Sequence, residues 1–340
     1  MDKTRNTCNL FGMSISLDAK SKHMSNSRKR KLGTAIAPSE DLINEFIKSQ
    51  KTTTKSKQFN NPGADLENKA IKRSRHSEMV SPRKFAAIIC EDSEKWGGQD
   101  YLGKKIIEIF RQNDDEVWEY FKACSDEIPD KNKLADYEAF IVSGSHYSAN
   151  DEHPWVQHLE TFFKDLYQYQ ELSTTTSPPK LIGVCFGHQL IGKALGARVV
   201  KNVGGRFIFK PVHINVTDTL TKSEYYKDNF QSNHSLSLFQ SHSEEIIDLP
   251  CFAECVASSD NCRNEIVKYG DSVLTFQGHM EITEDEMLEK ILPDIKKANI
   301  FNEEEEQEMF QALKEKGSDR KKVVDLIKSF MYSGQHDTYT

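Results

Sequence analysis

Residues 181–189 read Leu-Ile-Gly-Val-Cys-Phe-Gly-His-Gln, an apolar run followed by a cysteine between two glycines. The run up to Val184 is typical of a buried strand, and the residues from Gln189 to Leu195 have helical spacing. A nucleophile on a sharp turn between a strand and a helix forms the G-x-S-x-G elbow, and here sulfur takes the place of oxygen. Such a turn places Cys185 at the N-terminus of the helix, where the helix dipole favours the thiolate.

A histidine and a carboxylate follow far downstream. The apolar run 273–276 is typical of a strand, and it leads to His279, with Glu281 two residues later. In extended backbone, residues i and i+2 point to the same side, so Glu281 can reach the ring nitrogen of His279 that faces away from Cys185. A nucleophilic thiol needs a histidine to take its proton and a third group to orient that histidine. Cys185, His279 and Glu281 are therefore the predicted catalytic residues.

These motifs resemble those of the class I, triad-type glutamine amidotransferase domain, in which Cys, His and Glu occur in this chain order. The resemblance spans about residues 84–290. One departure is Met280, where the family usually has a proline after the histidine. A proline there would stiffen the turn without taking part in the chemistry, so the expected triad stands.

The resemblance implies further roles around the nucleophile. An oxyanion hole would use the backbone N–H of Phe186 and a second N–H at Gly144 or Ser145. The run 139–142 before these two residues independently reads as a buried strand that ends in a turn of small residues. Two such donors typically lower a barrier by about 2.7–4 kcal/mol each. Three residues are expected to help hold the glutamyl substrate: Gln189, Ser241 and His242.

Within this family, the chain is most similar to the stand-alone γ-glutamyl peptidases of plants and to related fungal amidotransferases. The similarity lies in the segments 140–145, 151–156, 241–246 and 269–273. It implies hydrolysis of the γ-glutamyl amide bond of a small molecule, namely glutathione, a glutathione conjugate or a γ-glutamyl peptide. The reaction would pass through a γ-glutamyl thioester on Cys185.

Two other functions remain open at this stage. A glutaminase subunit would deliver ammonia to a separate synthetase. The residues after 290 are too few for a synthetase, and no G-x-x-x-x-G-K-[ST] loop occurs in the chain, which favours a stand-alone hydrolase. An inactive binding or regulatory protein is the alternative from another class, and an intact triad argues against it.

A metal site is the alternative use of three other cysteines, because Cys251 and Cys255 lie four residues apart and Cys262 follows. A structural zinc ion needs four ligands, and no pair of histidines stands nearby at ligand spacing. The residues between these cysteines also alternate as in a strand. We therefore expect neither a metal ion nor a cofactor.

Strand-like and helix-like segments alternate before and around the elbow. Strands are expected at 85–90, 116–121, 137–143 and 181–184, and helices at 103–111 and 155–169. This alternation predicts an α/β fold with a flavodoxin-like open sheet, mostly parallel, covered by helices on both faces. Active sites of such sheets lie beyond the carboxyl ends of the strands, where Gly144, Cys185 and His279 are expected.

The pattern changes after residue 198. Short alternating runs at 207–216, 235–240, 253–258 and 265–269 predict antiparallel hairpins near the substrate pocket. Three helical stretches follow at about 283–297, 303–316 and 318–331, and we expect them to pack back on the core. The predicted domains are a basic, disordered extension (1–83), the catalytic domain (84–297) and a helical C-terminal extension (298–340).

Charge separates the extension from the rest of the chain. Residues 1–83 carry 17 basic and 8 acidic residues, a net charge of +9. The remaining residues have a net charge of −16, and the two parts together give the total of −7. The extension is poor in aromatic residues, so it cannot bury enough apolar area to offset its chain entropy. A short amphipathic patch at 41–47 could form one or two helical turns. The acidic remainder argues against nucleic-acid binding by the catalytic domain.

The expected compartment is the cytoplasm. Seven cysteines without framework spacing suit a reducing compartment. No apolar run is long enough to span a bilayer, and the first thirty residues have no apolar segment of a secretory signal. The basic clusters 28–31 and 72–75 are candidate nuclear import signals, which would make an import receptor a partner. A solvated basic tail is the plainer alternative.

Overall fold

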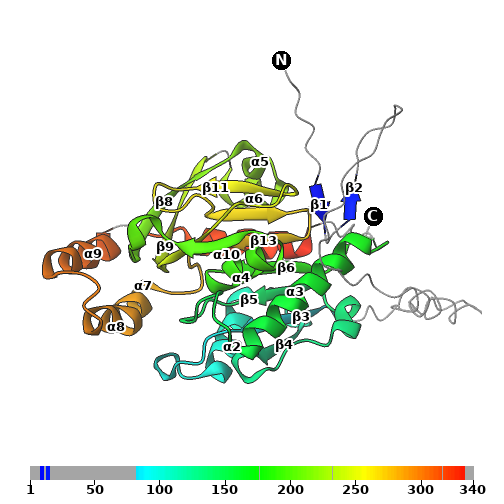
Figure 1. Ribbon diagram of the computed structural model, residues 1–340, viewed down its shortest axis with the longest axis horizontal. Helices are drawn as coiled ribbons and strands as arrows, with labels where there is room; N and C mark the ends of the chain where they lie inside the picture. Colours follow the sequence, from blue (N-terminus) through cyan, green and yellow to red (C-terminus); the bar gives the residue numbers. More distant parts are fainter. Residues whose placement is uncertain are drawn as a thin grey trace, which may run out of the picture. The chain divides into compact units, whose positions relative to one another are not determined.

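The computed structural model describes residues 8–10, 13–15, 82–175, 177–231, 233–315 and 317–333 (Figure 1). The chain divides into two units, Met1–Val80 and Ser81–Thr340. Within the first unit, the described residues form two short antiparallel strands, β1 (Cys8–Leu10) and β2 (Met13–Ile15), which the sequence did not predict. The patch 41–47, both basic clusters and most of the stretch predicted to be disordered lie outside the described residues, and these expectations stay predictions. The described residues of β1 and β2 form strands where disorder was predicted.

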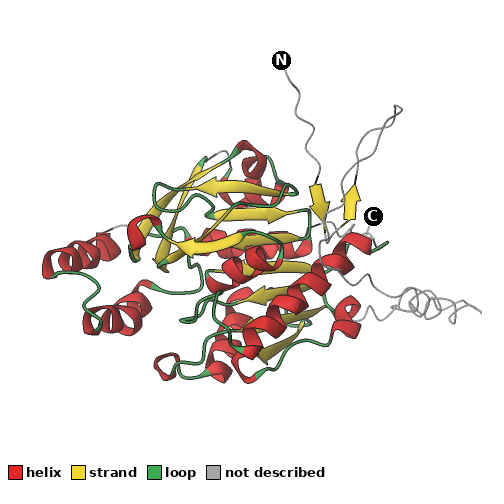
Figure 2. Cartoon of the chain, in the orientation of Figure 1, coloured by secondary structure: helices red, strands yellow, loops and turns green. Residues whose placement is uncertain are grey.

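The described residues of the second unit build a nine-stranded sheet in the order β4-β3-β5-β6-β13-β12-β11-β8-β9 (Figure 2). Its first five strands are parallel to one another. They are β4 (Val117–Lys122), β3 (Lys84–Ile89), β5 (Ala139–Val142), β6 (Lys180–Val184) and β13 (Val273–Phe276). The expected parallel α/β sheet is confirmed.

The last four strands pair antiparallel, as predicted for this part of the chain. They are β12 (Ile266–Tyr269), β11 (Ala253–Ser258), β8 (Ile208–Val216) and β9 (Ser235–His242). A separate antiparallel pair, β7 (Arg198–Lys201) with β10 (Glu244–Ile247), was not predicted. The short helices α5 (Asp218–Thr221) and α6 (Glu224–Phe230) were not predicted either.

Helices cover both faces of the parallel strands. Alternate residues of β3 show the division: Phe85 packs in the same core cluster as residues of α2 (Gln99–Phe110) and α10 (Arg320–Tyr332). Its neighbour Ala86 packs in the cluster that contains residues of α3 (Pro154–Leu172) and α4 (Phe186–Ala194). The sheet is therefore buried on both sides, which explains why its strands read as continuous apolar runs.

The stretch 283–297 forms three short pieces where one helix was predicted. A capping box of Thr283 and Glu286 opens α7 (Glu284–Glu286), a π-helical turn η5 (Met287–Ile291) follows, and α8 (Leu292–Lys297) ends the segment. Two further helices follow, α9 (Glu303–Glu315) and α10, whose residues Leu326 and Ile327 are fully buried. The buried side chains of α10 thus belong to the same core cluster as Phe85 of β3.

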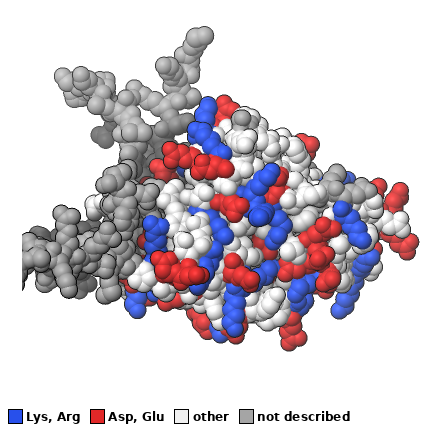
Figure 3. Space-filling view, turned by 180° about the vertical axis from the view of Figure 1, so that it is seen from behind, with Lys and Arg blue, Asp and Glu red and all other residues white. Residues whose placement is uncertain are grey.

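Four 3₁₀ turns complete the described elements: η1 (Glu94–Trp96), η2 (Ala123–Ser125), η3 (Lys131–Asp136) and η4 (Val203–Gly205). On the face in Figure 3, acidic and basic side chains are interspersed and do not form a region of one sign. Among the described residues, no helix has the length and apolar character needed to cross a bilayer.

Candidate active site

Cys185 lies on the turn that joins β6 to α4. Its backbone has φ 50° and ψ −104°, a left-handed conformation that costs a residue with a side chain of order 1–3 kcal/mol. Two hydrogen bonds hold the turn: the N–H of Cys185 donates to the carbonyl of Phe276 at 2.8 Å, and the N–H of Gln189 donates to the carbonyl of Cys185 at 2.9 Å. The predicted elbow is therefore present, and β13 helps to fix it.

Gly183 and Gly187 stand where neighbouring atoms leave no room for a side chain. A Cβ on Gly183 would lie 2.7 Å from Cδ1 of Ile191 and 2.8 Å from the carbonyl of Gly187. A Cβ on Gly187 would lie 2.7 Å from the carbonyl oxygen of Val142. The two glycines thus let α4 start directly against the ends of β5 and β6, which brings the start of the helix close to the sheet edge.

His279 and Glu281 form a buried pair. Nδ1 of His279 lies 2.8 Å from Oε1 of Glu281, and the two residues are 5% and 6% exposed. Burial alone would lower the pKa of His279, but the charges of Glu281 and Cys185 and hydrogen bonds to both hold that pKa well above its ordinary value. Burial alone would raise the pKa of Glu281. The charge of His279 and the hydrogen bond between the two side chains hold the pKa of Glu281 below its ordinary value. The pair therefore favours an imidazolium beside a carboxylate.

Three groups surround the thiol of Cys185. The carboxamide nitrogen of Gln277 lies 3.7 Å from the sulfur, and the sulfur lies 4.0 Å from the carbonyl oxygen of Ser241. A Cβ on Gly144 would lie 3.5 Å from Cβ of Cys185 and 3.1 Å from Cε1 of His279. Gly144 is thus placed against both predicted catalytic side chains. Gln277 was not predicted, although its position two residues before His279 in the same extended stretch was a usable signal.

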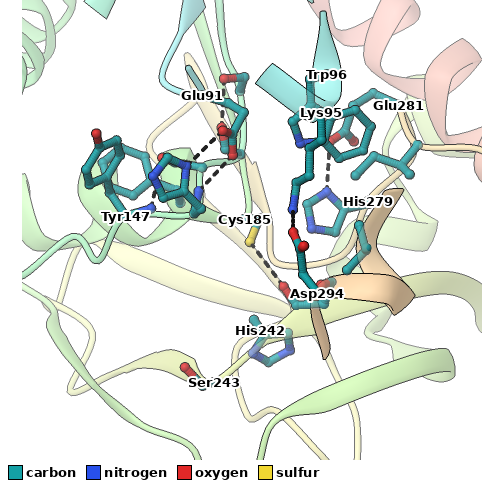
Figure 4. A pocket seen from close by; sticks show the side chains of 18 of the residues that line it. Glu91, Lys95, Trp96, Tyr147, Cys185, His242, Ser243, His279, Glu281 and Asp294 are labelled. Atoms are coloured by element: carbon teal, nitrogen blue, oxygen red, sulfur yellow. Dashed lines mark hydrogen bonds and ion pairs between the residues drawn. The ribbon is translucent and has the colours of Figure 1, made fainter. Parts of the chain in front are cut away.

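All nine predicted site residues line one cavity of about 390 Å³ (Figure 4). They are Gly144, Ser145, Cys185, Phe186, Gln189, Ser241, His242, His279 and Glu281. The cavity lies beyond the carboxyl ends of β5, β6 and β13, where ligands bind in open α/β sheets. The structure therefore brings the predicted residues together, and their individual roles stay predictions.

The predicted oxyanion donors occupy suitable backbone positions. Phe186 is the first residue of α4, and the first N–H groups of a helix have no acceptor within the helix. Gly144 and Ser145 follow β5 directly. The hydroxyl of Ser143 links this loop to β3, since it accepts from the N–H of Cys90 and donates to the carbonyl of Gly144, both at 2.9 Å.

Glu91 braces the same loop and was not predicted. Its Oε2 accepts from the backbone N–H of His146 at 2.9 Å, and its Oε1 lies 2.8 Å from Nδ1 of His146. Oε1 also accepts from the N–H of Ser93 at 2.7 Å. The carboxylate is 10% exposed and so joins the loop after β3 to the loop after β5. Its position directly after a buried strand was the signal in the sequence.

Gln189 and His242 already have protein partners. The amide nitrogen of Gln189 donates to the carbonyl of Glu244 at 2.8 Å and to Oε1 of Gln277 at 3.1 Å. Nδ1 of His242 lies 2.9 Å from the same carbonyl of Glu244, so it carries the proton. Burial lowers the pKa of His242 to about 4, which keeps the ring neutral. Both side chains tie the cavity wall to β10.

His188 is a buried side chain of α4. It is fully buried under the elbow, its Nδ1 lies 2.8 Å from the hydroxyl of Thr275, and burial lowers its pKa to about 3.

One group of side chains has the spacing of metal ligands: Glu91, Asp92 and His146 each place one ligand atom within 4.8 Å of the others. Nδ1 of His146 is already engaged by Glu91, and its Nε2 lies 3.9 Å from Asp92. The contacts between Glu91 and His146 therefore explain the proximity of these side chains without a metal ion.

Comparisons with known proteins give the family. The sequence model of Glutamine amidotransferase class-I matches residues 116–297. The chain is 30% identical over 216 residues to gamma-glutamyl peptidase 2 of Arabidopsis thaliana, which covers 64% of this chain and 82% of that protein. It is 27% identical over 256 residues to gamma-glutamyl peptidase 5 of the same plant, with 74% and 97% covered. A solved glutamine amidotransferase from Thermotoga maritima has a TM-score of 0.55 at 18% identity and covers 74% of this chain and 99% of that one.

The family match spans more than half of the chain, so the protein belongs to the class-I glutamine amidotransferase family. It is an enzyme of that type, a cysteine hydrolase, as the expected resemblance implied. The solved structure agrees with the α/β fold described above.

Proposed function

We propose that this protein hydrolyses γ-glutamyl amide bonds in glutathione, its conjugates or γ-glutamyl peptides through a thioester on Cys185. One observation carries the proposal: Cys185 and the buried His279–Glu281 pair line the same cavity as the predicted oxyanion loop. The similarity to two plant proteins named γ-glutamyl peptidases supports the choice of bond. The cavity volume of about 390 Å³ suits a small molecule.

The first half-reaction is acylation. The thiolate of Cys185 attacks the γ-carbonyl carbon and forms a C–S bond, while the carbonyl oxygen becomes an oxyanion held by N–H groups near Gly144 and at Phe186. The C–N bond then breaks, and the imidazolium of His279 gives its proton to the leaving nitrogen. Glu281 holds the ring through Nδ1, so Nε2 is the nitrogen that faces the reaction.

The second half-reaction is hydrolysis. Water enters once the amine has left, and the now neutral His279 takes a proton from it as its oxygen attacks the thioester carbon. The C–S bond breaks, glutamate leaves, and the thiolate and imidazolium are restored. No atom or electron is left over, so the cycle needs only water and the γ-glutamyl substrate.

The test is a side-by-side assay of glutamate release. Purified protein is given glutathione, a γ-glutamyl dipeptide or free glutamine at the same concentration. We expect faster release from the peptides. A hydrolase that serves no synthetase does not have to produce ammonia, so its substrate need not be glutamine. Equal rates, or faster release from glutamine, would contradict the peptidase assignment and favour a glutaminase subunit that serves a synthetase.

A further inference from the structure

The cavity has two halves of different chemistry. Around Cys185 and below it in Figure 4 lie polar side chains, among them Ser243 and His242. The other half is lined by apolar side chains from the β3–α2 loop, α2, the residue before β8 and the helical segment after His279. Six of them define this apolar half: Trp96, Ile106, Phe207, Ile291, Ile295 and Ile300.

The apolar half lies on the side of His279. In Figure 4, Trp96 and Lys95 lie on the same side of Cys185 as His279, whereas Tyr147 lies on the opposite side. The chain agrees, because Ile282 follows the His279–Glu281 pair directly and also lines the cavity. A general acid must reach the nitrogen that it protonates, so the leaving group must occupy the side of His279.

The cations of this half are already paired. Nζ of Lys95 lies 2.7 Å from Asp294, and Nζ of Lys105 lies 2.5 Å from Glu286. Both acids come from the helical segment after His279, Glu286 from α7 and Asp294 from α8. An incoming charged side chain would therefore lose hydration without gaining a free partner there, whereas an apolar side chain would only displace water.

We propose that the leaving residue of the substrate carries an apolar side chain, aliphatic or aromatic, which binds in this half of the cavity. The inference rests on the proposed function and extends it to the group beyond the scissile bond. It makes the substrate class γ-glutamyl peptides with an apolar residue next to the γ-glutamyl group.

The test compares kcat/KM for γ-glutamyl-leucine, γ-glutamyl-glycine and γ-glutamyl-lysine. We expect the leucine substrate to exceed the glycine substrate by about tenfold or more, since one methylene group in an apolar pocket is worth about 10–200-fold. The lysine substrate should fall at or below the glycine substrate. Equal kcat/KM for all three would overturn the inference and leave the γ-glutamyl hydrolase function standing. Glutathione is assayed beside them: glutamate from glutathione but from none of the three dipeptides would overturn the inference alone, and no glutamate from any of the four would refute the proposed function and the inference together.

Two variants connect the preference to the wall of the cavity. Phe207 is half-buried and Ile300 is 42% exposed, so Phe207→Ser and Ile300→Ser should preserve the fold. Each should reduce the ratio of leucine to glycine kcat/KM to about a quarter of its original value or less, since even one methylene group of lost apolar contact is worth about fourfold. The matched control is Leu172→Ser, which removes an exposed aliphatic side chain that does not line the cavity and should keep the ratio. An unchanged ratio in both cavity variants would contradict the assignment of this wall.

Discussion

Cys185 differs from the other buried cysteines in its surroundings. Burial raises the pKa of Cys90 and Cys262 well above the ordinary value for a thiol, so these two are inert packed side chains. Cys185 instead stands on a strained turn at a helix N-terminus, with the amide of Gln277 3.7 Å from its sulfur. Cys185 therefore stands at the position of a nucleophile, at the start of a helix and beside an amide donor, whereas Cys90 and Cys262 are packed core side chains.

Glu281→Gln tests the His279 pair through the pH profile. The Glu281 charge raises the pKa of His279, so the variant should lower that pKa. Acylation uses protonated His279, and kcat/KM therefore falls as pH rises through this pKa. We expect the alkaline limb of kcat/KM to move to lower pH, with a loss of about 100-fold or more at the optimum. The exposed control Asp285→Asn should keep the wild-type profile, and an unmoved limb in Glu281→Gln would contradict the role.

Glu91→Gln tests whether Glu91 positions the oxyanion loop. The N–H of His146 donates to Oε2 and that of Ser93 to Oε1, so replacing either oxygen by an NH₂ group removes the acceptor of one of them. A displaced loop weakens transition-state binding, so kcat should fall about tenfold while KM changes little. Glu94→Gln is the control, since it removes the same charge from an exposed position in the same loop. A change in KM alone would contradict the positioning role.

At the scale of elements, the elbow requires β5, β6 and α4 to meet at Gly187. We expect Gly187→Ala to lower the free energy of unfolding by about 2 kcal/mol or more, because its Cβ would lie 2.7 Å from the carbonyl of Val142. Urea unfolding measures the change. Gly317→Ala is the control, since a Cβ there meets no atom within 4 Å. Equal unfolding midpoints for the two variants would show that the close approach is not needed.

The elements that the sequence predicted are those with a strong local pattern. The strands before Gly144 and Cys185 are continuous apolar runs, so both the parallel sheet and the place of the nucleophile could be predicted. β7 and β10 have four residues each and pair across more than forty positions, which no local pattern contains. The stretch 283–297 has helical spacing, but Pro293 has no N–H to donate, and the chain changes from the π-helical turn to α8 there.

The candidate site shows the same division. Cys185 lies between the two glycines of an elbow motif, and His279 and Glu281 lie two residues apart, so both local patterns could be recognised in the sequence. Gln277 and Glu91 act through contacts with residues 92 and 55 positions away, at Cys185 and His146, so their places in the sequence were a signal but only the folded chain shows their partners. The apolar half of the cavity was also unpredicted, because it joins side chains from segments as far apart in the chain as those of Trp96, Phe207 and Ile295.

At the scale of the whole molecule, the site belongs to one unit. Every described residue that lines the cavity lies within Ser81–Thr340, whereas the basic excess of +9 lies in residues 1–83. We therefore expect removal of residues 1–80 to leave kcat/KM unchanged for γ-glutamyl-leucine. The comparison uses full-length and shortened protein with matched circular dichroism spectra. A large loss of kcat/KM in a folded shortened protein would show that the extension contributes to the site.

The covalent intermediate is the most direct test of the mechanism. Full-length protein is mixed with a γ-glutamyl dipeptide, quenched in acid within the first turnovers and digested for mass spectrometry. We expect a γ-glutamyl group on the peptide that contains Cys185, and neither this adduct nor glutamate release in Cys185→Ala. Glutamate release by Cys185→Ala at the wild-type rate, or an adduct on another residue, would contradict the account.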